Sequence, residues 1–306
     1  MNIEMTEYHG VPDCIRLSNG AVELVATTAF GPRILHYGLA GAANLFAVFE
    51  EDIAQWKSPA TEVEQEWRSY GGHRLWHAPE VKPRTYIPDN VAVSHAWDDG
   101  RLVLGPVLEE ENGLEKTMTV TLSENDSHVL IDHEISNQGP WEIELSAWCL
   151  SVMAPGGELT VPQEEYRAHP DYLAPARPVV VWHFTAMDDP RLEWGSRFIR
   201  MRQDDSHPEK VKFGTRNTKG WASYLLGDVL FVKQYPFSED AAYPDMGCNC
   251  EFYTQPGFLE IETLSPVTKL KPGGTVTHRE RWTLRRLEPD QRDASADEIV
   301  ASLGVG

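Results

Sequence analysis

The sequence predicts an all-β protein that folds as one large antiparallel β-sandwich. Short runs of alternating or β-branched residues recur along the whole chain, which is the pattern of half-buried strands. Turn-forming clusters such as Ser18-Asn19-Gly20 and Pro272-Gly273-Gly274 separate these runs. Helical patterns are few. Strands joined by turns, with little helix, favour a sandwich.

The expected strands follow one another at short intervals. In chain order they are Cys14–Leu17, Val22–Thr27, Arg33–Leu39, Val91–Trp97, Leu102–Val107, Leu114–Leu122, His128–Ser136, Glu142–Leu150, Pro178–Phe184, Phe198–Arg202, Trp221–Leu226, Val229–Tyr235, Glu251–Thr254, Phe258–Thr263 and Val276–Leu287. A turn or two of helix is expected within Ala54–Ser69. A short C-terminal helix is expected after the capping box that begins at Ser295, with Ile299, Val300 and Leu303 on its apolar stripe.

Length alone leaves the number of domains open, because 306 residues suit one large domain or two ordinary ones. The 23 glycines and 21 prolines are spread along the chain as turn residues and do not gather into a linker. No internal repeat or low-complexity tract divides the sequence. We therefore expect residues 1–306 to form a single domain.

Charge and cysteine content narrow the class of partner. Lys and Arg number 27 against 47 Asp and Glu, a net charge of −20 that repels phosphate backbones and anionic lipids. We expect neither a nucleic-acid nor a membrane partner, and no apolar run approaches the length of a membrane helix.

The first ten residues lack the features of a secretory signal, and the four cysteines form no disulfide framework. A cytoplasmic location is expected.

The segment Ser69–Glu80 concentrates polar and aromatic residues after the adjacent glycines Gly71 and Gly72. A pyranose ring needs an aromatic surface for its C–H face and charged groups for its hydroxyls. Trp76, Arg74 and Glu80 have this chemistry, and a histidine, His73 or His77, has the pKa to move a proton near neutrality.

Two other interpretations of the segment Ser69–Glu80 stay open. A zinc site at His73 and His77 would require a helix, which Gly71-Gly72 and Ala78-Pro79 oppose. The segment could also be a tight turn with a core tryptophan and ordinary surface histidines.

A second group of candidates lies in Tyr243–Tyr253 and Phe258–Pro266. Glu260 and Glu262 alternate with apolar residues, so on a strand both carboxylates point to one face. On an exposed edge this is an ordinary solvated pair. On a concave, partly desolvated face, one of them would have a raised pKa and could act as a general base. No GxSxG, GxGxxG or Walker A motif supports another enzyme class.

Three segments together resemble the galactose mutarotase-like superfamily, which includes aldose 1-epimerases and hexose-6-phosphate mutarotases. Asn19–Gly38 is similar to the opening hairpin of that superfamily. Gly71–Pro79 is similar to its glycine-pair segment. Asp245–Gly273 is similar to its closing segment, in which a Glu-Thr pair precedes a Pro-Gly turn. The three segments occur in order over nearly the whole chain. The resemblance implies membership of an uncharacterised branch of the superfamily.

The resemblance implies a supersandwich of antiparallel sheets whose concave face binds a carbohydrate and interconverts its anomers without metal or organic cofactor. It places the general base at Glu262, directly before Thr263. The superfamily's general-acid histidine has no counterpart in Leu145–Gly157, so the resemblance leaves His73 or His77 as the acid. The expected substrate-binding residues are Arg33, Arg74, Trp76, Asp245 and Glu260.

The arginine that binds phosphate in the hexose-6-phosphate branch is replaced by Ser69-Tyr70. Together with the negative net charge, this favours a neutral sugar over a phosphorylated one. The function expected from the sequence is therefore aldose 1-epimerase-type isomerisation of a small carbohydrate. The alternative is a catalytically silent sugar-binding protein that uses the same face. The oligomeric state stays open, with a homodimer as one option.

Overall fold

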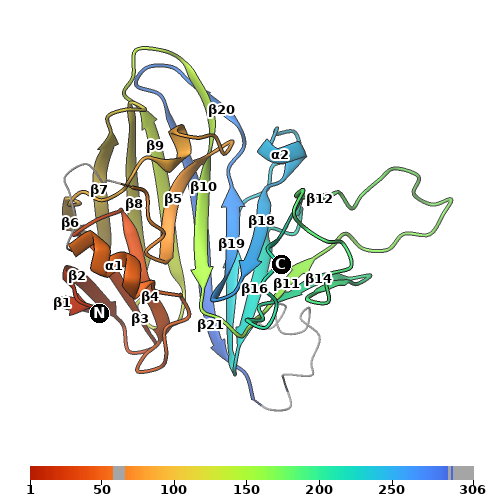
Figure 1. Cartoon of the computed structure of the whole chain (residues 1–306), viewed down its shortest axis with the longest axis horizontal. Helices are drawn as coiled ribbons and strands as arrows, with labels where there is room; N and C mark the ends of the chain where they lie inside the picture. The colour runs from red at the N-terminus through yellow and green to blue at the C-terminus, as the bar shows by residue number, and fades with distance from the viewer. Residues whose placement is uncertain (58–65, 289–290, 292–306) are drawn as a thin grey trace.

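The structure is a computed structural model that describes residues 1–57, 66–288 and 291. Its strands form two antiparallel sheets, one of eleven strands and one of ten (Figure 1). The predicted all-β class and the sandwich architecture are confirmed.

The eleven-stranded sheet has the order β1 (Asn2–Tyr8), β2 (Val11–Ser18), β3 (Val22–Thr27), β4 (Arg33–Leu39), β5 (Gly72–Ala78), β10 (Ile143–Met153), β19 (Phe258–Leu264), β18 (Cys250–Gln255), β15 (Val211–Thr215) and β12 (Val179–Val181), with β20 (Thr268–Leu270) also paired to β10. The ten-stranded sheet has the order β13 (Leu192–Trp194), β14 (Phe198–Arg202), β11 (Glu158–Pro162), β16 (Trp221–Leu226), β17 (Val229–Gln234), β21 (Thr275–Arg286), β9 (Val129–Asn137), β8 (Leu114–Leu122), β7 (Arg101–Glu109) and β6 (His95–Asp98).

Helices are short in the described part of the chain. They are α1 (Glu50–Lys57), a 3-10 turn (Arg84–Tyr86) and α2 (Pro244–Gly247). The helix expected within Ala54–Ser69 begins earlier than predicted, at Glu50. The expected C-terminal helix lies outside the described residues.

The main core lies between the sheets, and strand alternation produces it. On β10 the side chains of Ala147 and Cys149 belong to this core, whereas Trp148 and Leu150 belong to a separate cluster on the other face of the sheet. Ile261 on β19 packs into the same core. The opposite face of these strands is therefore free to form a site.

The segment that follows the glycine pair is the central strand β5, which was not among the expected strands and is not the tight turn left open as an alternative. It lies between β4 and β10. A Cβ atom on Gly72 would lie 2.2 Å from the carbonyl oxygen of Ile34, and one on Gly71 would lie 2.0 Å from that of Ala47. Both glycines have positive φ angles, of +71° and +80°. The two glycines therefore allow close packing against neighbouring backbone.

Candidate functional site

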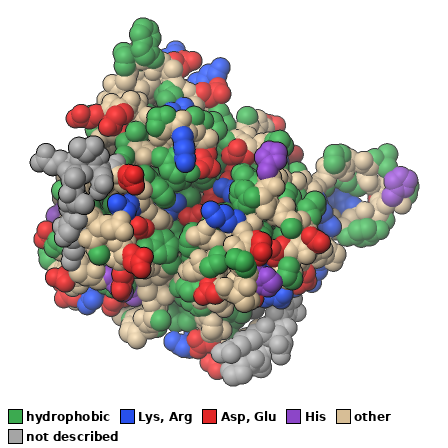
Figure 2. All heavy atoms as spheres, viewed as in Figure 1, with side chains coloured by type: hydrophobic (Ala, Val, Ile, Leu, Met, Phe, Trp, Pro, Cys, Tyr) green, Lys and Arg blue, Asp and Glu red, His purple; other side chains and the backbone are tan. Residues whose placement is uncertain are grey.

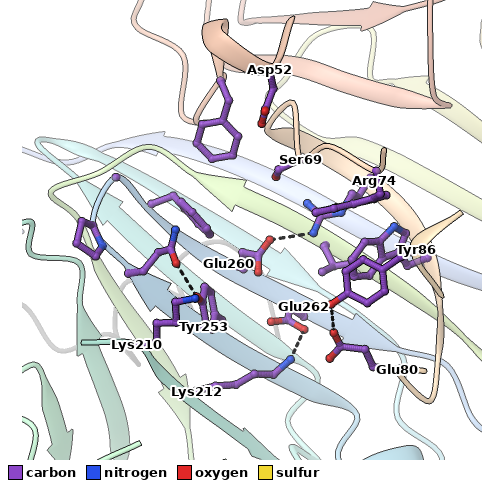
Figure 3. A pocket seen from close by; sticks show the side chains of 18 of the residues that line it. Asp52, Ser69, Arg74, Glu80, Tyr86, Lys210, Lys212, Tyr253, Glu260 and Glu262 are labelled. Carbon is purple, nitrogen blue, oxygen red and sulfur yellow. Dashed lines mark hydrogen bonds and ion pairs between the residues drawn. The ribbon is translucent and has the colours of Figure 1, made fainter. Parts of the chain in front are cut away.

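A pocket of about 1050 Å³ lies on the outer face of the eleven-stranded sheet (Figure 3). Its floor is formed by the central strands β5, β10, β19, β18 and β15. The side chains that matter for chemistry are charged or aromatic: Arg74, Glu80, Lys210, Lys212, Glu260 and Glu262, with Phe49, Trp67, Trp76, Tyr86, Trp148, Trp182, Phe184, Tyr253 and Phe258. Charged groups within aromatic walls are typical of a small-molecule site.

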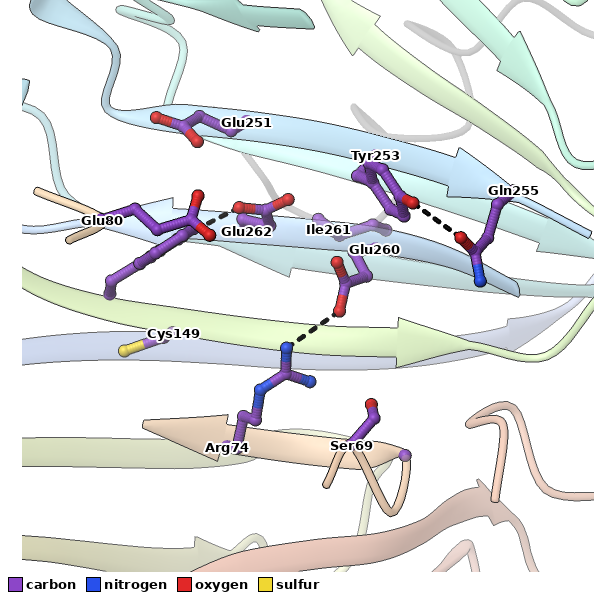
Figure 4. A network of polar contacts seen from close by, with 12 residues as sticks. Ser69, Arg74, Glu80, Cys149, Glu251, Tyr253, Gln255, Glu260, Ile261 and Glu262 are labelled. Carbon is purple, nitrogen blue, oxygen red and sulfur yellow. Dashed lines mark hydrogen bonds and ion pairs between the residues drawn. The ribbon is translucent and has the colours of Figure 1, made fainter. Parts of the chain in front are cut away.

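Strand register brings these side chains together from distant parts of the sequence. Leu150 on β10 pairs with Arg74 on β5 and with Glu262 on β19, and Glu262 pairs in turn with Glu251 on β18. Residues that are directly opposite across strands point to the same face. Figure 4 shows this arrangement, with the carboxylates along β18 and β19 and the guanidinium of Arg74 reaching toward Glu260.

Glu262 is buried in the pocket floor, and one of its two carboxylate oxygens is held in place. The indole N–H of Trp148 donates to Oε2 at 2.9 Å, and the ammonium of Lys212 donates to the same atom at 3.0 Å. The other oxygen, Oε1, has no hydrogen-bond partner among the described residues. Burial raises the pKa of Glu262 to about 7, although Lys212 opposes the shift. Glu260 and Glu262 thus lie on one desolvated face and are not a solvated pair on an exposed edge.

Lys212 joins two carboxylates. Its Nζ lies 2.8 Å from Glu251 and 3.0 Å from Glu262. The ammonium also lies between two indole rings, 5.0 Å from the centroid of Trp148 and 4.7 Å from that of Trp182. Burial favours its neutral form, but the two carboxylates outweigh burial and raise its pKa. Lys212 therefore stays charged and favours the ionised form of its partners.

Arg74 holds the second carboxylate of the pair. Its Nη2 donates to Glu260 at 3.1 Å, and its guanidinium lies 4.6 Å from the ring centroid of Trp76. Its Nε and Nη1 atoms are buried, and neither has a partner within the described part of the chain. An unpartnered buried donor costs about 1–3 kcal/mol. Arg74 and Glu262 thus place unpartnered donors and an unpartnered acceptor in the floor of one pocket.

His73 does not reach the pocket, because it lies on the opposite face of β5 from Arg74. It is fully buried between the sheets, where its Nε2 lies 2.7 Å from Nε2 of His133 and its Nδ1 lies 2.9 Å from Oγ of Ser151. His133 donates from Nδ1 to the carbonyl of His278. Since burial lowers the pKa of both His73 and His133, they are neutral, and His73 must donate to His133.

His77 shares the face of His73, two pleats further along β5. Its ring is buried, and neither ring nitrogen has a hydrogen-bond partner in the described residues. Burial lowers the pKa of His77 to about 2, with Lys116 as the next cause. The expectation of a histidine acid from this segment does not fit these positions, because strand alternation turns both rings away from Glu262. Of the described pocket-lining residues, none is a histidine.

Arg33 and Asp245 also lie away from the pocket lining. The Arg33 guanidinium donates to the carbonyl oxygens of Ser69 and Gly71 at 2.6 and 2.7 Å and to the Asp89 carboxylate at 2.6 Å. It braces the backbone before β5. Asp245 lies in the turn of α2 with a φ of 49°, half-buried at one end of the sheet. Both were expected to bind substrate.

The buried histidines form part of a polar cluster with metal-ligand chemistry: ligand atoms of His73, His133 and Glu280 lie within 4.8 Å of one another. The carboxylate of Glu280 already has a cationic partner, since Nζ of Lys233 lies 2.8 Å from it. The same ammonium donates to the carbonyl of Ile261 at 3.1 Å. The cluster thus joins β17 and β21 of one sheet to the strand of Glu262 in the other.

Sequence reasoning missed several pocket residues. Lys212 lies on β15, far in the sequence from the segments that carry the predicted candidates, and no local motif marks it. Trp148 lies in Leu145–Gly157, the segment that lacks the superfamily's histidine. Its aromatic side chain was the one feature of that segment that could have indicated a sugar-binding residue. Trp182 lies next to the short strand β12, which the pattern of Pro178–Phe184 did predict.

Comparison with known proteins bears on the fold. The sequence matches no protein-family profile. No curated protein is significantly similar to it. The structure resembles a galactose mutarotase-like protein from Lactobacillus casei, with 12% identity, a TM-score of 0.55 and coverage of 89% of this chain and 100% of that one.

Two other solved structures are similar over comparable lengths of this chain. A candidate aldose 1-epimerase from Escherichia coli K12 has 13% identity and a TM-score of 0.54, with 93% and 100% of the two chains covered. A TPR-domain containing protein from Parabacteroides distasonis has 11% identity and a TM-score of 0.59, with 92% of this chain and 49% of that one covered. The chain has the galactose mutarotase-like fold.

The galactose mutarotase-like fold agrees with the superfamily that the three sequence segments indicated. Within the described residues, no helix is long and apolar enough to cross a bilayer. Basic side chains on the face shown in Figure 2 are scattered among acidic and hydrophobic ones. Strands β5, β10 and β19, which carry residues of the pocket lining, lie in the middle of the eleven-stranded sheet (Figure 1).

Proposed function

We propose that the pocket binds a neutral carbohydrate and that the protein interconverts its anomers, as an aldose 1-epimerase does. The observation that carries the proposal is the state of Glu262. One carboxylate oxygen is held by Trp148 and Lys212, whereas Oε1 is buried and free to accept a proton. A pKa of about 7 suits a base that must gain and lose a proton near neutrality.

In this mechanism Glu262 takes the proton of the anomeric hydroxyl. The C1–O5 bond breaks with its electron pair going to the ring oxygen, and the anomeric carbon becomes the aldehyde of the open chain. The negative charge that develops on the ring oxygen is stabilised by a cationic hydrogen-bond donor. Rotation about C1–C2 presents the other face of the carbonyl, and on reclosure the ring oxygen attacks C1 while Glu262 returns its proton to the anomeric oxygen. Trp148 and Lys212 keep the carboxylate oriented throughout.

The ring oxygen needs a donor, and the pocket supplies donors other than histidine. Arg74 has unpartnered N–H groups. The hydroxyl of Tyr253 donates to Gln255 at 2.7 Å, and that of Tyr86 donates to Glu80, so each would have to exchange its partner for the substrate. Arg74 is therefore the donor that we assign to the ring oxygen, as a hydrogen-bonding group that remains protonated.

The second candidate function is a catalytically silent sugar-binding protein. It is favoured by one observation, that no histidine lines the described pocket. In that case the free groups of Glu262 and Arg74 would hold hydroxyls without proton transfer. Both candidates share the pocket and differ only in turnover.

Anomer exchange followed by NMR or polarimetry over a panel of neutral sugars tests the proposal. We expect the wild-type protein to accelerate exchange and Glu262→Gln to lose about 10²–10⁴-fold of that rate. Glu251→Gln is the matched control, because Glu251 shares Lys212 but does not line the pocket. An active Glu262→Gln variant would contradict the assigned base. Binding without any acceleration by the wild type would establish the silent alternative.

A further inference from the structure

The aromatic side chains of the pocket form two separate clusters. The near cluster contains Trp67, Trp76, Tyr86 and Trp148, whose successive ring centroids lie 5.0 to 5.4 Å apart. The far cluster contains Phe49, Phe184, Tyr253 and Phe258, with successive centroids 5.3 to 6.3 Å apart. All eight side chains line the pocket, and no ring contact between described residues joins the two clusters.

The near cluster adjoins Glu262, since its member Trp148 donates to the carboxylate. The far cluster lies further along the same floor. Phe258 precedes Glu262 by four residues on β19, roughly 13 Å at about 3.3 Å per residue, and Tyr253 pairs across strands with Glu260. In Figure 3, Tyr86 and Tyr253 lie on opposite sides of Glu260 and Glu262.

One sugar ring cannot reach from Glu262 to the far end of the second cluster at Phe258. A pyranose with its anomeric hydroxyl at Glu262 covers the near cluster, and a single six-membered ring does not extend from there to Phe258. The far cluster is nonetheless open to a ligand, since Phe184 is 48% exposed at the pocket. The pocket volume of about 1050 Å³ lies at the upper end of the range for drug-sized ligands, well beyond one hexose.

We propose that the substrate is a saccharide of at least two rings, with its reducing end at Glu262 and its next ring stacked on the far cluster. This inference rests on the proposed carbohydrate function and names the substrate class. Stacking of a sugar C–H face on an aromatic ring explains why a second set of rings lies away from the base. The acidic first turn of α1, with Glu50, Glu51 and Asp52 at the pocket wall, favours neutral sugars over anionic ones.

Calorimetric titration with matched sugars tests the inference. Glucose is compared with maltose and cellobiose, and galactose with β-1,4-galactobiose. We expect at least one disaccharide to bind about tenfold more tightly than its monosaccharide. Equal affinity of every disaccharide and its monosaccharide would overturn the inference.

Variants locate the second ring. Phe258→Ala should weaken binding of the preferred disaccharide until its Kd is close to that of the monosaccharide. The Kd of the monosaccharide should stay within about twofold of its wild-type value. Phe258→Tyr should restore tight binding of the disaccharide. Trp76→Ala should weaken both ligands. Phe237→Ala is the matched control, because Phe237 stacks on Tyr243 away from this pocket. Equal weakening of both ligands by Phe258→Ala would contradict a second subsite.

The outcomes separate this inference from the proposed function. Catalysed anomer exchange of monosaccharides, with no gain from a second ring, would leave the function standing and remove the inference. Tighter binding of disaccharides without catalysis would remove the proposed isomerase activity and leave the second sugar subsite standing. Absence of binding by every sugar in the panel would remove both.

Discussion

The ammonium of Lys212 lies 3.0 Å from the carboxylate of Glu262, and both side chains are buried in the floor of the pocket. Burial raises the pKa of this carboxyl group, and the adjacent ammonium lowers it, so that the pKa is about 7. The pair therefore sets the pH at which Glu262 becomes a base. This relationship leads to the first two predictions.

Replacing Lys212 with methionine should move the pH dependence of anomer exchange. Lys212 lowers the pKa of Glu262, so its removal raises that pKa, and the base is ionised only at higher pH. We expect the acidic midpoint of the pH–rate profile to rise by about one unit or more. Lys210→Met is the matched control, because Lys210 lines the same pocket but is not an ion-pair partner of Glu262. A shared shift in both variants would contradict this role of Lys212.

Glu262→Gln should stabilise the protein at high pH. The folded pKa of Glu262, about 7, exceeds the ordinary value of 4.5, so the folded state binds more protons and wild-type stability falls as pH rises from 4.5 through 7. The Glu262→Gln variant does not lose stability in this way. Its free energy of unfolding relative to wild type should therefore increase by about 3 kcal/mol between pH 4.5 and pH 7. Denaturant unfolding at pH 4.5 and pH 8 measures it. A stability difference that is independent of pH would contradict the raised pKa.

Arg33→Met should destabilise the fold by about 3–5 kcal/mol, because it leaves Asp89 and two carbonyl groups without their buried partner. Arg279→Met is the matched control, since that arginine is 64% exposed in its pair with Asp132 and should cost less than about 1 kcal/mol. Urea denaturation of the two variants provides the comparison. Similar small losses in both would show that Arg33 is not a brace.

The cluster between the sheets should show strong coupling between Lys233 and Glu280. Lys233→Met leaves a buried carboxylate without its ammonium and should cost about 3–5 kcal/mol. Adding Glu280→Gln removes the stranded charge and should recover much of that loss. A double-mutant cycle from thermal unfolding checks the coupling. Additive effects of the two substitutions would exclude it.

Much of the fold could be predicted from strand periodicity and turn residues. The alternation at Phe258–Leu264 predicted a strand with Glu260 and Glu262 on one face, as the structure has it. β5 was missed because its glycine pair and its following proline are also typical of a turn. The short strands β13 and β15 were also missed.

For the site, local pattern indicated Arg74, Trp76, Glu260 and Glu262, which all line the pocket. It also favoured His73 and His77. Once Gly72–Ala78 is a strand, alternation separates Arg74 and Trp76 from the two histidines and places them on opposite faces. The alternation rule, applied to Gly72–Ala78 as a strand, is therefore sufficient to exclude the two histidines from the face that carries Arg74.

By itself, the sequence determined the class of the protein: strand-length periodicity, turn residues and three ordered segments lead to a mutarotase-like sandwich. Only the tertiary structure decided which residues share the pocket. Lys212, Trp148 and Glu262 come from three strands, and their proximity depends on cross-strand register, which is set by the whole sheet. The raised pKa of Glu262 likewise depends on burial and on Lys212, two properties that no local segment contains.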